Sequence, residues 1–540
     1  MAGTDRPRPD RDFATRYEKL VELGIALSSE RNHDRLTETI LIEAMGFCNA
    51  DGGTLYLRDA DALRFVIVRN RSLGIALGGT TGKAPPFAPL ALFDAATGLP
   101  NHNNVATYVA LSGKTVALAD AYAATDFDFS GTRRFDASMG YRSQSFLTLP
   151  LRNHRDEVIG VLQLINALDP ATEAPIEFEG RSRRLVEALA SQAAIAIDNQ
   201  DLIRGQKDLL EAFIKVIAMA IDRKSPYTSG HCQRVPVLTE MLADAACAAT
   251  AGPFRDFGLD DDGWYELRIA GWMHDCGKVT TPEHVVDKPT KLSTIHDRIE
   301  SVALRVEILR RDALIEALRR GQPESDCATR LAALDDDLAF LRSANKGGEA
   351  LGDDAISRIR RIATERWRDG GGAERSLLDA DEVENLSIRR GTLTGKERKI
   401  INDHIVATID MLEALPFPKH LKRVPEYAGG HHEKMDGTGY PRGLRREQMS
   451  VPARMMAIAD IFEALTARDR PYKGAMKLSQ AIRIMADMKR DHHVDPDLFD
   501  LFVESGVFRR YAEKFLDADQ IDEPDVSAAL AAKPRSAASA

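Results

Sequence analysis

Five histidines and two aspartates carry the side chains that a two-metal hydrolytic site requires. Neutral imidazoles supply nitrogen ligands, and a single carboxylate can bridge two cations. Two such cations would neutralise a phosphodiester, hold it in place and activate a water for attack at phosphorus. These residues therefore predict hydrolysis of an anionic phosphate ester. They are His231, His274, Asp275, His404, His431, His432 and Asp460.

The adjacent pair His274 and Asp275 offers both ligand types to one centre within a single turn of backbone. Lys278 follows closely and suits stabilisation of a leaving oxygen, although capping a helix C-terminus is its alternative role. Cys276 lies in the same motif, and we interpret it as a small packed residue. The sequence shows no evident Ser-His-Asp or Cys-His arrangement for covalent catalysis.

The order of these motifs resembles the HD-GYP subgroup of the HD phosphohydrolase superfamily. His274 and Asp275 match the "HD" signature, and Gly439, Tyr440 and Pro441 match the "GYP" signature. The resemblance covers two blocks of the chain. Further similar segments are residues 225–231, 282, 288–292, 457–460, 469–472 and 494–496.

The resemblance implies an all-α catalytic domain with two divalent metal ions held between helices. The first ion would be bound by His231, His274, Asp275 and Asp460, and the second by His404, His431, His432 and the bridging Asp275. Fe or Mn is favoured, while Zn, Ni and Mg remain open. Lys278 would contact the scissile phosphate. Further substrate contacts would come from Arg470, Gly439, Tyr440 and Pro441.

The same resemblance implies hydrolysis of a cyclic dinucleotide, chiefly cyclic di-GMP, to pGpG and further to GMP in some cases. Another cyclic dinucleotide or phosphate ester is an alternative substrate. A catalytically weak adapter that uses the GYP surface to bind partners is a third hypothesis. We favour the enzyme because an adapter does not need seven metal ligands.

Two positions depart from the family pattern. Some members have a glutamate four residues before the first histidine, which recruits a third metal; here that position is Tyr227, so we expect two metals. The usual His-Pro at the fourth ligand is His404-Ile405 here. Proline would shape a helix start rather than bind metal, so ligation by His404 is still expected.

The chain has a second pair of adjacent histidines, His492 and His493, which can be compared with His431 and His432. No complementary ligands surround His492 and His493, and an Asp-Pro helix start follows them. We therefore interpret both as structural. His284, His296 and His420 are interpreted in the same way.

Composition limits the class of protein. The chain of 540 residues is long enough for three or four domain equivalents, with 44% hydrophobic and 29% charged residues. A net charge of −10 argues against general binding of nucleic-acid polymers. Five scattered cysteines, no signal peptide and no long apolar run predict a cytoplasmic protein that does not enter membranes. We expect residues 1–14 and 516–540 to be disordered.

Residues 15–205 predict an α+β sensor domain. Helices are expected at 17–27, 36–47 and 185–197, and strands at 53–57, 63–68, 145–151 and 158–166. Residues 113–120, 140–147 and 158–166 resemble a GAF domain. Ala167, Ser182 and Arg183 depart from the cyclic-nucleotide-binding pattern, so the ligand is unknown, and a domain that binds nothing and only dimerises remains an alternative.

Residues 206–224 are expected to form a connecting signalling helix. Ile195, Leu202, Leu209 and Val216 recur every seven residues, which suits a parallel two-helix coil in a homodimer. A single long helix packed within a monomer is the alternative.

The catalytic domain is expected over residues 225–515, with a helical insertion at about 293–391. Apolar residues at helical spacing around 295–309, 331–341 and 356–362 predict three helices there. The insertion either extends the core as a helical hairpin or serves as an arm for partner docking or dimerisation. Its charge pattern does not separate these two interpretations.

Overall fold

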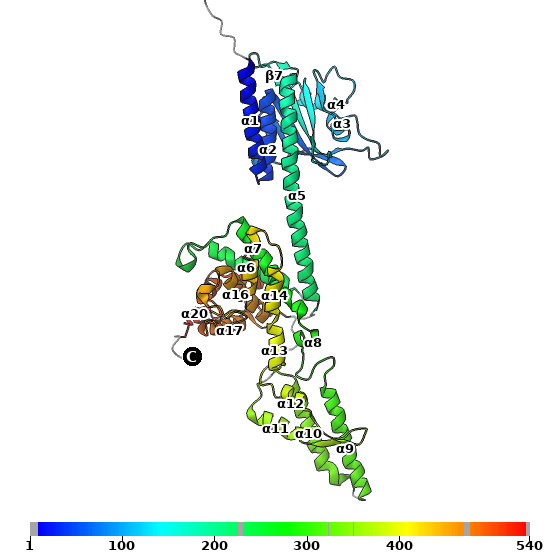
Figure 1. Cartoon of the computed structure of the whole chain (residues 1–540), viewed down its shortest axis with the longest axis vertical. Coiled ribbons are helices and arrows are strands. Elements are labelled where there is room, and N and C mark those ends of the chain that lie inside the picture. The colour runs from blue at the N-terminus through cyan, green and yellow to red at the C-terminus, as the bar shows by residue number, and fades with distance from the viewer. Residues whose placement is uncertain (1–8, 225–229, 322, 349, 469–475, 536–540) are drawn as a thin grey trace, which may run out of the picture. The chain divides into compact units, whose positions relative to one another are not determined.

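The chain divides into two compact units, residues 1–209 and 210–540 (Figure 1). The computed structural model describes residues 9–224, 230–321, 323–348, 350–468 and 476–535. The expected combination of an α+β domain followed by a helical region with an insertion is confirmed.

The first unit is built on one antiparallel sheet in the order β3-β2-β1-β7-β6-β5, with β4 beside β2 and β8 beside β7. Its strands are β1 (Ala50–Asp59), β2 (Ala62–Asn70), β3 (Ile75–Leu77), β4 (Leu90–Ala91), β5 (Val116–Leu118), β6 (Phe146–Arg152), β7 (Val158–Leu168) and β8 (Pro175–Ile176). Its helices are α1 (Pro9–Ser29), α2 (His33–Cys48), η1 (Gly79–Thr81), α3 (Val105–Ser112), α4 (Ser130–Met139) and the first part of α5 (Gly180–Lys224).

Each face of this sheet has its own core. Successive strand residues point to opposite faces, so Leu55 joins the cluster under α1, α2 and α5, whereas Tyr56 joins the cluster with α3. The four strands expected from alternation are all present. The short strands and the helices α3 and α4 were not predicted, because their sequences carry little periodicity.

Helix α5 is continuous over 45 residues, as the proline-free sequence indicates. Ile195, Leu202, Leu209 and Val216 on this helix are 48%, 42%, 56% and 56% exposed. The seven-residue repeat is therefore an apolar seam that nothing within the described chain covers.

Helices make up most of the second unit outside the insertion, and they enclose a single large apolar cluster. They are α6 (His231–Cys247), η2 (Gly252–Phe254), α7 (Asp261–Met273), η3 (Cys276–Thr280), α8 (Glu283–Val286), α13 (Gly395–Asn402), α14 (His404–Glu413), η5 (Lys419–Leu421), α15 (Val424–Gly429), η6 (Arg446–Gln448), α16 (Val451–Thr466), α17 (Leu478–Arg490), α18 (Pro496–Glu504), α19 (Val507–Phe515) and α20 (Val526–Ala531).

The insertion folds around a separate small core that includes Val302, Leu341 and Ile359. It contains the three expected helices and, in addition, a two-stranded hairpin at Gly370–Gly372 that we did not predict. Its elements are α9 (Ile299–Arg319), η4 (Glu324–Cys327), α10 (Ala328–Asn345), α11 (Asp353–Ala363), β9 (Arg366–Arg368), β10 (Glu374–Ser376) and α12 (Ala380–Leu386).

The disorder expected at both ends is wrong in part. Helix α1 already begins at Pro9, and the tail from residue 516 to residue 535 packs on the second unit. The buried Gln520 donates from its amide to the carbonyls of Thr466, at 2.9 Å, and Met476, at 3.2 Å. Asp525 caps helix α20 by accepting from the backbone N–H of Ala528. Polar anchors, which composition does not reveal, hold this Ala-rich segment.

None of the helices that the structure describes is both long enough and apolar enough to cross a membrane.

Candidate metal centre

The seven expected ligands come from five stretches of the chain that meet near one point. His231 is the first residue of α6, and His404 is the first residue of α14. His274 ends α7 and Asp275 precedes η3. His431 and His432 follow α15, and Asp460 lies within α16. Except for Asp460, these positions lie at helix ends or in the turns beside them, so side chains far apart in sequence converge.

One group of potential ligand atoms is formed by His231, His274 and Asp275. The Nε2 atom of His231 lies 3.2 Å from Asp275 Oδ2 and 3.2 Å from Asp460 Oδ1. The Nε2 atom of His274 lies 3.3 Å from that of His231 and 3.4 Å from Asp275 Oδ2. These four side chains are the ones expected to bind the first metal.

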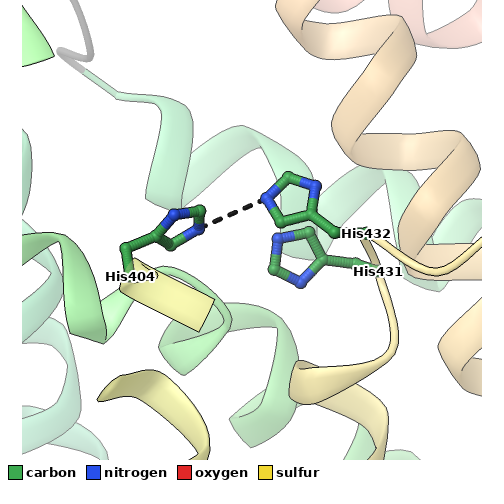
Figure 2. A group of neighbouring side chains, drawn as sticks. All are labelled: His404, His431 and His432. Atoms are coloured by element: carbon green, nitrogen blue, oxygen red, sulfur yellow. Dashed lines mark hydrogen bonds between the residues drawn. The ribbon is translucent and has the colours of Figure 1, made fainter. Parts of the chain in front are cut away.

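The second group comprises His404, His431 and His432 (Figure 2). The Nε2 atoms of His404 and His432 lie 3.3 Å apart. Figure 2 shows the three imidazole rings converging, with His404 opposite the adjacent pair. These are the three histidines expected to bind the second metal.

Asp275 connects the two groups. Its Oδ2 faces His231 and His274, whereas its Oδ1 lies 3.3 Å from the Nε2 atom of His404. The residue is 1% exposed. A buried carboxylate with one oxygen toward each group is the arrangement that a bridging ligand needs.

Unsatisfied buried atoms fit this interpretation. Asp275 Oδ1 and His431 Nε2 are buried and accept no hydrogen bond among the described residues. Such atoms are costly unless something binds them. The other ring nitrogens are already fixed, since the Nδ1 atoms of His274 and His431 donate to the carbonyls of Gly271, at 2.7 Å, and Ala428, at 2.6 Å. The Nε2 lone pairs then point to the centre, so these residues suit a metal.

Electrostatics favour the protonation states that bind a cation. Burial acts to raise the pKa of Asp275, but the charges of Lys278 and His274 and the hydrogen bonds from His231 and His274 together hold that pKa well below its usual range. Burial also acts to raise the pKa of Asp460, and the hydrogen bond from His231 together with the charges of the surrounding histidines holds it well below its usual range. Burial lowers the pKa of His431 to about 4 and that of His432 well below its usual value. Both carboxylates are therefore charged and both imidazoles neutral at neutral pH.

Glu463 contacts the proposed ligand His231, a role that the sequence did not reveal. It is 1% exposed and accepts from the Nδ1 atom of His231 and from the Nε atom of Arg234, at 2.7 Å. This carboxylate fixes the orientation of the His231 ring. Its position three residues after Asp460 was the available signal, because both then lie on one face of α16.

Lys278 lies at the rim of the cluster. Its side chain is 22% exposed and its ammonium group donates to Asp275 Oδ2. The backbone here is tight, because a Cβ atom on Gly277 would lie 2.0 Å from the carbonyl oxygen of His404. Glycine therefore allows α14 to approach η3 and bring His404 to Asp275.

The Gly-Tyr-Pro loop borders the cluster. The ring of Tyr440 stacks on that of His432, with centroids 4.9 Å apart. Buried Glu433, also not predicted, shapes the loop by accepting from the backbone N–H groups of Arg442, at 2.7 Å, and Leu444, at 2.9 Å. A Cβ atom on Gly439 would lie 2.3 Å from the backbone nitrogen of Lys434, which explains the glycine.

Cavities open directly beside the ligands. One, of about 190 Å³, is lined by residues that include His231, Lys278, His404, Tyr440 and Asp460. A second, of about 500 Å³, shares His432, Tyr440 and Asp460 with the first. Lys278 and Tyr440 thus face a space next to the cluster.

Other expected residues lie elsewhere. Arg470 and Tyr227 fall outside the described residues. His492 donates from Nε2 to the carbonyl of Arg535, at 2.7 Å, and takes no part in either ligand group. His493 also lies outside both groups, but it lines the second cavity. Cys276 is buried, and burial raises its pKa to about 11.

Comparison with protein families finds two domains. A family model described as "GAF domain" matches residues 32–197. A model described as "HD domain" matches residues 380–498, which include His404, His431, His432 and Asp460. The chain contains a GAF domain and an HD domain.

Curated proteins that are similar to parts of this chain carry phosphodiesterase names. One named 3'3'-cGAMP-specific phosphodiesterase 3, from Vibrio cholerae, is 24% identical over 62% of this chain and 47% of its own length. A cyclic di-GMP phosphodiesterase of Pseudomonas aeruginosa is 49% identical over 14% of this chain and 18% of its own length. The chain thus spans about half, or less, of these relatives.

Solved structures resemble the GAF domain. The GAF domain of a phosphoenolpyruvate-protein phosphotransferase from Acinetobacter is 16% identical, covering 35% of this chain and 96% of that one, with a TM-score of 0.26.

Proposed function

We propose that this chain is a metal-dependent phosphodiesterase that opens a cyclic dinucleotide, with cyclic di-GMP as the leading substrate and pGpG as the first product. The observation that carries the proposal is Asp275, which directs one carboxylate oxygen to each of two groups of histidines. The names of the relatives support the substrate class.

Two divalent ions, when bound, would supply Lewis acidity to the phosphate and lower the pKa of a water. The ligands proposed for one ion are His231, His274, Asp275 and Asp460, and those for the other are His404, His431, His432 and Asp275. Imidazole-rich ligation with carboxylates suits Fe or Mn, while Zn, Ni and Mg remain open.

The chain's own groups complete the site. Lys278 lies at the cavity with its ammonium group at Asp275, where it can turn to a phosphate oxygen and stabilise charge that develops on the leaving oxygen. Tyr440, fixed on His432, forms part of the wall against which a substrate ring can rest. Arg470 is kept as a proposed substrate contact from sequence alone.

A mixed cyclic dinucleotide, 3'3'-cGAMP, is the second candidate substrate. A relative that matches 62% of this chain supports it, since its name specifies that compound. Purified protein, loaded with Mn²⁺ or with Fe²⁺ under anaerobic conditions, should hydrolyse one of the two compounds. Separation of the nucleotide products by chromatography will show which compound is the substrate. If neither compound is hydrolysed, the proposal is contradicted.

The GAF domain is proposed to regulate the HD domain through α5. The exposed seam of Ile195, Leu202, Leu209 and Val216 supports a parallel homodimer, since an apolar seven-residue repeat is the contact surface of a two-stranded coil. An unidentified small molecule bound by the GAF domain would be the signal.

A further inference from the structure

We propose that Arg398 and Lys434 form a second anion-binding subsite, which holds the phosphodiester that is not being cleaved. The inference rests on the proposed cleavage of a cyclic dinucleotide and deepens it. Both side chains line the cavity of about 500 Å³ that adjoins the metal centre. The same cavity is lined by His432 and Asp460, so a molecule that fills it also reaches the proposed ligands.

The charge of Arg398 is not neutralised locally. The residue is exposed on α13, and its side chain makes no ion pair with any residue that the structure describes. It also lines a third cavity, of about 420 Å³, together with Asn402 and Tyr440. The carboxylate of Asp403 borders that third cavity but is already paired with Lys399, at 2.7 Å.

The helix that carries Arg398 is held firmly. Buried Lys288 donates to both carboxylate oxygens of Glu397, each at 2.8 Å, and to Asn385 Oδ1, at 2.7 Å. Glu397 in turn closes a capping box with Thr394 at the start of α13. Asn385 belongs to α12, the last helix of the insertion. Through Lys288, α12 is therefore linked to Glu397, the residue that precedes Arg398.

Lys434, the second cation of the proposed subsite, follows the His431-His432 pair in the sequence. It is half-buried and forms no ion pair within the described part of the chain. The carboxylate of Asp436 is near enough for an electrostatic interaction with Lys434 but forms no ion pair with it, and it accepts from the backbone N–H and the hydroxyl of Thr438, at 2.9 and 2.8 Å. Lys434 thus lines the cavity as a cation without a direct ion-pair partner among the described residues.

The remaining lining suits a nucleobase. Ile461, Leu465, Met476 and Met488 supply an apolar wall, and His493 adds an aromatic ring. Among the described residues, Asp460 is the carboxylate on this cavity, and it is a proposed metal ligand. A pocket with two cations, an apolar wall and an aromatic ring matches a nucleoside phosphate.

Substrate chemistry explains why a second subsite is needed. A cyclic dinucleotide carries two phosphodiesters in one ring, and a single metal centre can neutralise only the one being attacked. The other is anionic and would lose hydration on entering the cavity, so it requires protein cations. A small ester with one phosphate makes no such demand, and the subsite would then select for the larger substrate.

Two substrates test the subsite. Full-length Arg398→Ala and Lys434→Ala should each raise KM for cyclic di-GMP or 3'3'-cGAMP about tenfold, the loss expected for one charge-assisted hydrogen bond. kcat for the same compound, metal content, and kcat/KM for bis(p-nitrophenyl) phosphate should all stay within twofold. Arg398→Lys should recover part of the affinity. Lys396→Ala, which removes a charge from α13 away from the cavities, is the matched control.

The outcomes separate this inference from the proposed function. If the parent hydrolyses neither cyclic dinucleotide, the proposed function fails and the subsite fails with it. If the parent is active and both variants keep its KM, the subsite alone is overturned. Equal losses on the cyclic dinucleotide and on bis(p-nitrophenyl) phosphate would also overturn it, because they would indicate damage to the metal centre.

Discussion

At the scale of single residues, the proposed chemistry depends on how buried polar atoms are satisfied. Asp275 and His431 each leave one buried acceptor atom without a partner among the described residues, while the far sides of the His274 and His431 rings donate to backbone carbonyls. A centre in which ring orientation is fixed and lone pairs converge is prepared for cations before they arrive.

Glu463 is predicted to act through His231 rather than on substrate. Glu463→Gln should weaken metal affinity about 10- to 100-fold, since the amide cannot hold both the imidazole N–H and Arg234 as a carboxylate does. Titration of metal-free protein with Mn²⁺ measures this affinity directly. Glu447→Gln, an exposed substitution of the same type, is the control. Unchanged affinity in Glu463→Gln would contradict the positioning role.

The two histidine pairs are predicted to behave differently. His431→Ala removes a proposed ligand and should lower turnover by orders of magnitude. His492→Gln combined with His493→Gln should leave kcat within a few-fold of the parent, because neither residue belongs to a ligand group, although KM can rise because His493 lines the second cavity. Steady-state kcat at saturating substrate is the measurement. Comparable losses in the two proteins would refute the distinction.

Sequence indicated the proposed ligands through short motifs such as His274-Asp275 and His431-His432, and through the order of these motifs, which resembles that of a known family. Glu463 was missed because its partner His231 is 232 positions away. Glu433 was missed for a different reason: it bonds backbone N–H groups, and no residue type marks such a partner. The residues proposed to bind metal can be found from short stretches of sequence. The residues that orient them are distant in sequence or contact only the backbone, so they are found only in the folded structure.

At the scale of elements, α13 connects the insertion to the metal centre. Arg398 lies within this helix and His404 begins the next one, and α13 is fixed by the contact between Lys288 and Glu397. The side chain of Lys288 is 1% exposed. Removing one partner of such a buried pair leaves an uncompensated charge, which costs about 3 kcal/mol or more.

Lys288→Met is accordingly predicted to destabilise α13. Hydrogen exchange of amides 395–402 should accelerate, and unfolding by denaturant should shift by about 3 kcal/mol if this unit unfolds cooperatively. Lys399→Met on the same helix breaks only the exposed pair with Asp403 and should cost less than about 1 kcal/mol. Equal exchange in the two variants would show that the buried pair does not hold the helix.

Long periodic elements were predictable and short ones were not. The strands β1, β2, β6 and β7 and the helices of the insertion alternate or repeat over many residues. The β9–β10 hairpin consists of two three-residue strands, Arg-Trp-Arg and Glu-Arg-Ser, so no apolar alternation marks it. The tail was misjudged because Gln520 and Asp525 stabilise it through specific hydrogen bonds, which average composition hides.

At the scale of the whole molecule, α5 runs from the GAF domain into the second unit without interruption and carries the exposed seam. In a parallel coil, a change of register or rotation at one end is passed along the helices to the domain at the other end. The length of the helix therefore matters as well as its apolar residues. This makes the spacing of the seam a testable part of the proposed regulation.

Insertions after Gln206 test the coil. Seven residues preserve the repeat and should leave basal activity near that of the parent, whereas four residues introduce a stutter and should change basal activity or the response to a GAF ligand. Light scattering should give the mass of a dimer for the parent. A monomer at working concentration, or identical behaviour of the two insertions, would exclude the coil.

The central claim is that Asp275 bridges two metal ions in a cyclic dinucleotide phosphodiesterase. Anaerobically purified parent and Asp275→Ala should be compared by elemental analysis and by hydrolysis of cyclic di-GMP and 3'3'-cGAMP. The account predicts two ions per parent chain with hydrolysis of at least one compound, and loss of most metal and activity in the variant. Three ions per chain, or normal metal content in Asp275→Ala, would contradict it.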